Sequence, residues 1–200
     1  MSEVKRAVAT FADGSEVDLC AFRSVRVPEA AALDALDAPD TVTRARDLWS
    51  ILRGGYCTRW HANAAMAHIR ETLAEHHARI AQILLALHPD PSLALIDAAL
   101  HHDAGEPEVG DVPSPVKRDN PELAAILDAI EARARRRLGV PEVREADRDW
   151  LKFADRLAAF LHVQHVNPRE LDDLDWRRDR NWLRDEARRL GVSDQICGLL

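Results

Sequence analysis

The chain has 200 residues, of which 46% are hydrophobic and 30% charged, and this composition is typical of a folded globular protein rather than a disordered one. The length suits one domain with a substantial core, since single domains commonly reach ~200 residues. The formal net charge of -7 argues against non-specific binding to a nucleic-acid polymer. Aromatic residues make up only 5%, and the abundant alanine, leucine and arginine favour helices over sheets.

The cysteines and the hydropathy exclude two further classes of protein. Cys20, Cys57 and Cys197 are widely spaced and form no Cys-x-x-Cys pair, so they predict neither a disulfide framework nor a zinc ribbon. No apolar run approaches the ~18 residues of a membrane span, and the N-terminus lacks the apolar core of a signal peptide. We therefore expect a protein of the reducing cytoplasm without membrane association.

The first element expected along the chain is a small β-hairpin. Two β-rich segments, residues 4–11 and 16–22, flank a turn signal at residues 12–15. This hairpin is assigned to an N-terminal extension, residues 1–40, whose function the sequence does not indicate.

Capping residues, prolines and glycines predict that the remainder, residues 41–200, is one all-α domain. The clearest start signal is a capping box formed by Thr72 and Glu75. Another helix is expected to start at a cap on Asp40 or Thr41 and to end at Gly54-Gly55. The helices expected in this domain cover residues 41–52, 73–87, 93–101, 121–138 and 145–165, with one or two surface helices over 168–190. A further helix is expected at residues 29–36, within the N-terminal extension.

The segment from Ala99 to Lys117 contains glycines and three prolines, which predict a folded loop. His102 and Asp103 stand directly after the predicted helix 93–101, and Glu106 follows three residues on. An imidazole beside a carboxylate offers ligands that divalent metals accept, and Glu106 lies near enough to act on a metal-bound water. An isolated pair of this kind is, however, more often a capped helix end followed by a polar turn.

Two further polar residues lie on apolar helix faces. A lone histidine on such a face, as at His76, is more often a satisfied core residue than a ligand. Asp155 interrupts the apolar face of the helix 145–165, where an ionised carboxylate is costly unless it is paired or metal-bound. Lys152 precedes Asp155 by one turn on the same side. His77 points roughly 100° away from His76 and is expected either to support the ligands or to be exposed.

Taken in order, the polar motifs resemble those of the 5′-deoxynucleotidase branch of the HD-domain metal-dependent phosphohydrolases. The resemblance covers roughly residues 48–165, and the motifs that carry it are Arg59-Trp60, Ala74-Glu75-His76, His102-Asp103 with Glu106, Gly110-Asp111 with Pro115-Val116-Lys117, and Lys152 with Ala154-Asp155. It implies an HD-domain helical bundle around a metal site and a homodimer. His101 departs from the family pattern, which usually has an aromatic or aliphatic residue there, and is expected to support the ligands at most.

The resemblance also implies a ligand set and a division of roles. One divalent cation, cobalt, manganese or zinc, would be held by His76, His102, Asp103 and Asp155. Glu106 would act as general acid or base, and Asp111 would orient the water or the sugar. The phosphate would be bound by Arg59, Lys117 and Lys152, and Trp60 would pack on the deoxyribose, where close contact could exclude a 2′ hydroxyl.

The predicted function is hydrolysis of the 5′ phosphate ester of deoxyribonucleoside monophosphates. One alternative is a triphosphohydrolase of the phage type, which releases tripolyphosphate. Another is a non-catalytic HD-fold metal-binding scaffold, which would not need Glu106, Lys117 or Arg59. The Glu-Asp pair of the alarmone hydrolases and the Gly-Tyr-Pro motif of the cyclic-dinucleotide branch are both absent from the sequence.

Overall fold

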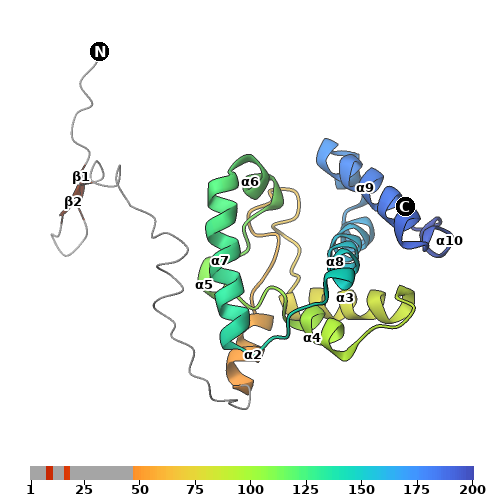
Figure 1. Ribbon diagram of the computed structural model, residues 1–200. Coiled ribbons are helices and arrows are strands. Elements are labelled where there is room, and N and C mark those ends of the chain that lie inside the picture. The colour runs from red at the N-terminus through yellow and green to blue at the C-terminus, as the bar shows by residue number, and fades with distance from the viewer. Residues whose placement is uncertain (1–7, 11–15, 19–46) are drawn as a thin grey trace. The chain divides into compact units, whose positions relative to one another are not determined.

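The computed structural model describes residues 8–10, 16–18 and 47–200 (Figure 1). The chain divides into two units, Met1–Thr41 and Val42–Leu200, which are treated separately. In the first, strand β1 (Val8–Thr10) pairs antiparallel with β2 (Glu16–Asp18). The expected turn, the rest of the expected hairpin and the expected helix 29–36 lie outside the described residues, so the hairpin as a whole stays a prediction.

The second unit is built from helices, which confirms the predicted all-α character of this part of the chain. None of the helices described is both long enough and apolar enough to span a bilayer. In chain order the helices are α2 (Leu48–Gly55), α3 (Leu73–Leu87), α4 (Leu93–His101), α5 (Glu106–Val109), α6 (Ser114–Asp119), α7 (Pro121–Arg137), α8 (Glu145–Val166), the 3-10 helix η2 (Pro168–Asp172), α9 (Leu174–Leu190) and α10 (Ser193–Ile196).

Helix α2 begins later than the sequence predicts. Asp47 is its N-cap: the Asp47 backbone is extended, and its carboxylate accepts a hydrogen bond from the backbone amide of Ser50 at 3.1 Å. A helix that started at Asp40 or Thr41 could not run through an extended residue, so that prediction is wrong. The predicted end of this helix at Gly54-Gly55 is confirmed.

The predicted capping box is confirmed, because capping depends on neighbours in the sequence. The Thr72 hydroxyl accepts from the backbone amide of Glu75, whose carboxylate accepts in return from the Thr72 amide. Ser92 caps α4 in the same way. Asn120 occupies the N-cap position of α7 without a side-chain capping hydrogen bond, because its side-chain amide donates to the carbonyl oxygen of Val116 in α6 instead.

Helix α3 packs against α4 and α8, and α9 packs against α8 (Figure 1). Burying one large apolar side chain contributes about 1.5–3 kcal/mol, so the shared core fixes these helices relative to one another. Its fully buried members include Met66, Leu73, Ile80, Leu84, Leu95, Phe153, Leu157 and Phe160. Consequently α3, the end of α4 and α8, which carry the predicted ligands, are held by the main hydrophobic core.

Gly105 brings the segment after α4 directly onto α7. A Cβ atom built at residue 105 would lie 2.7 Å from the Cα of Glu131, a backbone atom that cannot move aside as a flexible side chain can. Only glycine therefore permits this close approach, which places the segment carrying Asp103 and Glu106 against α7.

Candidate active site

Three helices bring the four predicted metal ligands into one cluster. Helix α3 supplies His76, the end of α4 supplies His102 and Asp103, and α8 supplies Asp155. Ligand atoms of His76, His102 and Asp103 all lie within 4.8 Å of one another. Oδ1 of Asp155 lies 2.9 Å from Nε2 of His76 and 3.8 Å from Nε2 of His102. Side chains far apart in the sequence thus meet around one point.

The orientation of His102 suits a metal ligand. Its Nδ1 atom lies 3.0 Å from the carbonyl oxygen of Ala99, and because a carbonyl only accepts, Nδ1 carries the hydrogen. Nε2 faces Oδ2 of Asp103 at 3.1 Å. In metal-bound histidines, a backbone carbonyl usually accepts a hydrogen bond from one ring nitrogen. The other ring nitrogen is then free to bind the metal.

The charges in the cluster favour a bound cation. Burial opposes protonation of His102, but the carboxylates of Asp103 and Asp155 outweigh it and raise the His102 pKa well above its usual value. Burial by itself would raise the pKa of Asp103, yet His102 and then His77 hold that pKa well below its usual range. Burial lowers the pKa of His76 to about 4, and the hydrogen bond to Asp155 offsets this only in part. Ionised carboxylates beside a neutral imidazole match the mixed donor set of a divalent metal.

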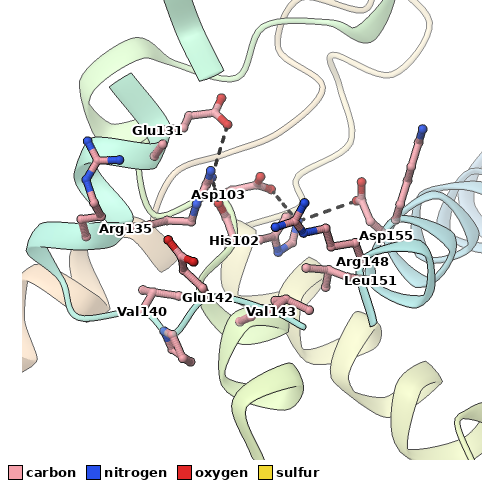
Figure 2. Close-up of a pocket in the computed structure, with 15 residues that line it drawn as sticks. His102, Asp103, Glu131, Arg135, Val140, Glu142, Val143, Arg148, Leu151 and Asp155 are labelled. Atoms are coloured by element: carbon pink, nitrogen blue, oxygen red, sulfur yellow. Dashed lines mark hydrogen bonds and ion pairs between the residues drawn. The ribbon is translucent and has the colours of Figure 1, made fainter. Parts of the chain in front are cut away.

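The cluster is reached from a cavity of about 480 Å³, which His102, Asp103 and Asp155 line (Figure 2). The side chain of Asp155 is 42% exposed whereas that of His76 is fully buried, so Asp155 marks the open side of the cluster. The other walls come from α7, from residues 140–143 and from the first half of α8. The basic residues that line this cavity are Arg135, Arg136, Arg148 and Lys152.

His77 is buried, which decides between the two alternatives left by the sequence. Its Nε2 atom lies 3.6 Å from Oδ2 of Asp103, and its ring centroid lies 4.7 Å from that of His102. The exposed alternative is therefore wrong, because the end of α4 covers the face of α3 on which His77 lies. His101, in contrast, bonds through Nδ1 to the carbonyl and carboxylate oxygens of Asp97.

Glu106 begins α5 and is only 7% exposed. Its backbone amide donates to the carbonyl oxygen of Asp103 at 3.0 Å, so the glutamate is anchored to the residue that carries a predicted ligand. Burial, followed by the charges of Asp103 and Asp111, raises the Glu106 pKa to about 8. Among the described residues its Oε2 atom has no hydrogen-bond partner. This carboxyl group is thus placed beside the cluster and is able to exchange a proton near neutral pH.

Arg59 and Trp60 lie in the segment between α2 and α3, as predicted. Trp60 has a backbone φ of 67°, and its amide donates to Oδ2 of Asp111 at 3.1 Å. The Arg59 guanidinium lies 5.1 Å from the centroid of the Trp60 ring. After burial and the bond to Asp155, the charge of Arg59 also acts on the pKa of His76, so Arg59 is within electrostatic reach of the cluster.

The two predicted phosphate-binding lysines differ in their surroundings. Lys117, in α6, has its Nζ atom 3.2 Å from Oε1 of Glu131. Burial opposes protonation of Lys117, but Glu131 and more distantly Asp103 raise its pKa. Lys152 lies at the surface of α8, where it lines the cavity and has its Nζ atom 5.7 Å from the Trp182 ring.

Several residues around the site escaped the sequence analysis. Glu71 is buried beneath Arg59 and Trp60 but belongs to no periodic pattern, so the sequence carried no signal for it. Glu131, on the charged helix α7, was not among the predicted site residues. Arg148 could have been identified, because it lies four residues before Lys152 and seven before Asp155 on one face of a helix.

A helical body in which His, His-Asp and Asp from three helices meet in one cluster is typical of the class of HD-domain phosphohydrolases. A family model described as 5′-deoxynucleotidase YfbR-like matches residues 49–165. The chain belongs to the YfbR-like 5′-deoxynucleotidase family. No curated protein shows a significant match. The matched range includes all four predicted ligands, whereas the expected homodimer stays a prediction.

Proposed function

We propose that the protein hydrolyses the 5′ phosphate ester of deoxyribonucleoside 5′-monophosphates to deoxynucleoside and phosphate. Membership of the family supports a hydrolase of the 5′-deoxynucleotidase type. The observation that supports the finer proposal is that Glu106 lies beside the cluster, with its backbone amide bonded to Asp103, and that Arg59 lies within electrostatic reach of the cluster. A scaffold that only held a metal would need neither group.

The cluster fits one divalent cation, for which we propose cobalt, manganese or zinc. The fit rests on the fixed orientation of the His102 ring and on the two carboxylates that face it. When bound, such a cation neutralises phosphate charge and acidifies water. Its ligands would be His76, His102, Asp103 and Asp155.

The remaining side chains bind the nucleotide and move the proton. The Arg59 guanidinium offers paired donors to phosphate oxygens, and the flat indole of Trp60 packs on the deoxyribose. Lys117 and Lys152 contribute point charges to the phosphate. Glu106 transfers a proton from the attacking water to the departing 5′ oxygen as the bond between phosphorus and that oxygen breaks.

Asp111 has two roles in this scheme. One of its carboxylate oxygens already accepts from the Trp60 amide, which fixes the backbone of the residue that would contact the sugar. Its other oxygen would orient the attacking water or a sugar hydroxyl. Asp111 therefore links the nucleoside side of the site to the reacting phosphate.

The reaction is tested by incubating metal-loaded protein separately with deoxyadenosine monophosphate and deoxyadenosine triphosphate. We expect inorganic phosphate and deoxyadenosine from the monophosphate, measured by phosphate release and chromatography. Adenosine monophosphate is the control, and it should react at least ~10-fold more slowly if Trp60 packs closely on the sugar. Release of tripolyphosphate, with the monophosphate left intact, would contradict the proposal.

The cavity favours the triphosphohydrolase as a second candidate function. Arg148, Lys152 and Asp155 are spaced four and three residues apart on α8 and line the same cavity, so the two cations form a row that leads away from Asp155. Within the described part of the chain neither cation forms an ion pair. A triphosphate brings about four negative charges, and a cleft must supply several cations to offset their desolvation.

Replacing Arg148 separates the two candidates. For a monophosphatase, Arg148→Ala is expected to leave KM for deoxyadenosine monophosphate within about 2-fold of the wild-type value, because no role is assigned to Arg148 at a single phosphate. For a triphosphohydrolase, the same change should raise KM for the triphosphate ~10-fold by removing a charge-assisted contact. Steady-state kinetics on both nucleotides measures this. Arg169→Ala is the matched control, since Arg169 is exposed and does not line the cavity.

A further inference from the structure

One buried carboxylate beside the nucleotide residues has no role in the scheme above. Glu71 lies in the segment between α2 and α3 and is 1% exposed. The indole Nε1 of Trp60 donates to its Oε2 atom, and Arg79 forms an ion pair with its Oε1 atom. Nη1 of Arg59 lies 3.8 Å and Nε2 of His162 lies 3.7 Å from Oε2. Four side chains therefore converge on one carboxylate.

The backbone of Glu71 holds the same segment. Its carbonyl oxygen accepts from the backbone amide of Arg59 at 2.9 Å. Next to this bond, Thr58 and Thr72 form an isolated antiparallel bridge. Residues 58–59 and 71–72 thus lie side by side, so Glu71 contacts Arg59 through its main chain and Trp60 through its side chain.

Trp60 needs such support because its conformation is unfavourable. A φ of 67° lies in the left-handed region, which a bulky side chain rarely adopts. Surrounding contacts must therefore determine this conformation. Asp111 holds the Trp60 backbone amide, and Glu71 holds the far end of the indole. His162 completes the arrangement by stacking on the indole with an interplanar angle of 16°.

The charge balance around Glu71 also bears on the phosphate. Two guanidinium groups, from Arg59 and Arg79, share this one carboxylate, so one positive charge remains in excess. Arg79 pairs with Oε1, whereas Nη1 of Arg59 lies 3.8 Å from Oε2 and has no hydrogen-bond partner among the described residues. The excess charge is thereby available to an anion that contacts Arg59.

We propose that Glu71 is a positioning residue of the nucleotide site, which fixes the Trp60 indole and the Arg59 guanidinium in the arrangement that receives sugar and phosphate. The inference rests on the proposed function, because it takes these two side chains as substrate contacts. Glu71 itself touches neither the substrate nor the ligand cluster. Its loss should therefore weaken nucleotide binding rather than remove a reacting group.

The first test compares Glu71→Ala and Glu71→Gln with the wild-type protein in steady-state hydrolysis of deoxyadenosine monophosphate. We expect KM to rise ~10-fold or more in the alanine variant, with kcat within about 3-fold and metal content unchanged, because a contact that only orders binding groups affects KM. Glutamine keeps an acceptor for the indole but loses the charge, so its effect should be smaller. Glu75→Gln is the matched control, since Glu75 is exposed and glutamine also completes a capping box.

A wild-type KM in both Glu71 variants would overturn the inference. If the alanine variant does not fold, the glutamine variant carries the test, and Glu71→Asp should then restore part of the affinity because it restores the charge. A loss of kcat and thermal midpoint with no rise in KM would indicate a purely structural role and also overturn it.

The second test asks whether Glu71 acts through Trp60. Trp60→Phe removes the Nε1 donor while keeping a flat ring, and Glu71→Ala removes its acceptor, so the KM effects of Trp60→Phe and Glu71→Ala should combine to clearly less than their product. Fully multiplicative effects would contradict the proposed route. Hydrolysis of the monophosphate by wild-type protein is measured in the same series. If the wild-type protein releases no phosphate, the proposed function fails. If the wild-type protein releases phosphate and the Glu71 variants have the wild-type KM, only the positioning role fails.

Discussion

The wild-type protein is expected to bind about one divalent metal ion per chain, and the His102→Ala and Asp155→Ala proteins are expected to lose it. Each change removes a predicted ligand from the cluster, in which Oδ1 of Asp155 lies 2.9 Å from Nε2 of His76 and 3.8 Å from Nε2 of His102. The His76 side of the cluster is fully buried, so no other side chain can replace the lost one from there. Elemental analysis after metal loading and desalting measures the occupancy. Phosphate release should fall with it.

The neighbouring histidine supplies the control for this experiment. His101 bonds to Asp97 and is not a member of the cluster, so His101→Ala should retain metal. Circular dichroism and thermal denaturation establish that each variant is folded. Full occupancy in folded His102→Ala and Asp155→Ala proteins would show that the assigned ligands are wrong.

Glu106→Gln is expected to lower turnover by ~100-fold or more while leaving metal content and nucleotide binding nearly unchanged. The reason is that Glu106 lies beside the cluster without belonging to it, and glutamine has the same shape but cannot transfer a proton. Single-turnover phosphate release measures the chemical step, and calorimetric titration with deoxyadenosine monophosphate measures binding.

Glu108→Gln is the matched control, because Glu108 lies two residues on and its carboxylate pairs with Arg137 rather than facing the cluster. It should turn over at about the wild-type rate. Wild-type turnover in Glu106→Gln itself would remove Glu106 from the mechanism. Metal binding without any turnover in the wild-type protein would favour the scaffold alternative.

The sequence by itself determined the local structure and the family. Caps at Thr72 and Ser92, and the ends of α3 and α4, depend on contacts within one helical turn, so they could be read directly from neighbouring residues. The order of the polar motifs identified the family, which the match over residues 49–165 confirms. The resemblance, rather than any spacing, suggested that His76 and Asp155 meet.

Only the tertiary structure decided what covers each helix face. The burial of His77 depends on the end of α4 lying over α3, and the convergence on Glu71 depends on residues from α3, α8 and the preceding segment. Helical periodicity gives the direction of a side chain but not its neighbour across an interface. The cavity between α7 and α8 likewise exists only once both helices are placed, because it is formed by packing between segments that no local interaction joins.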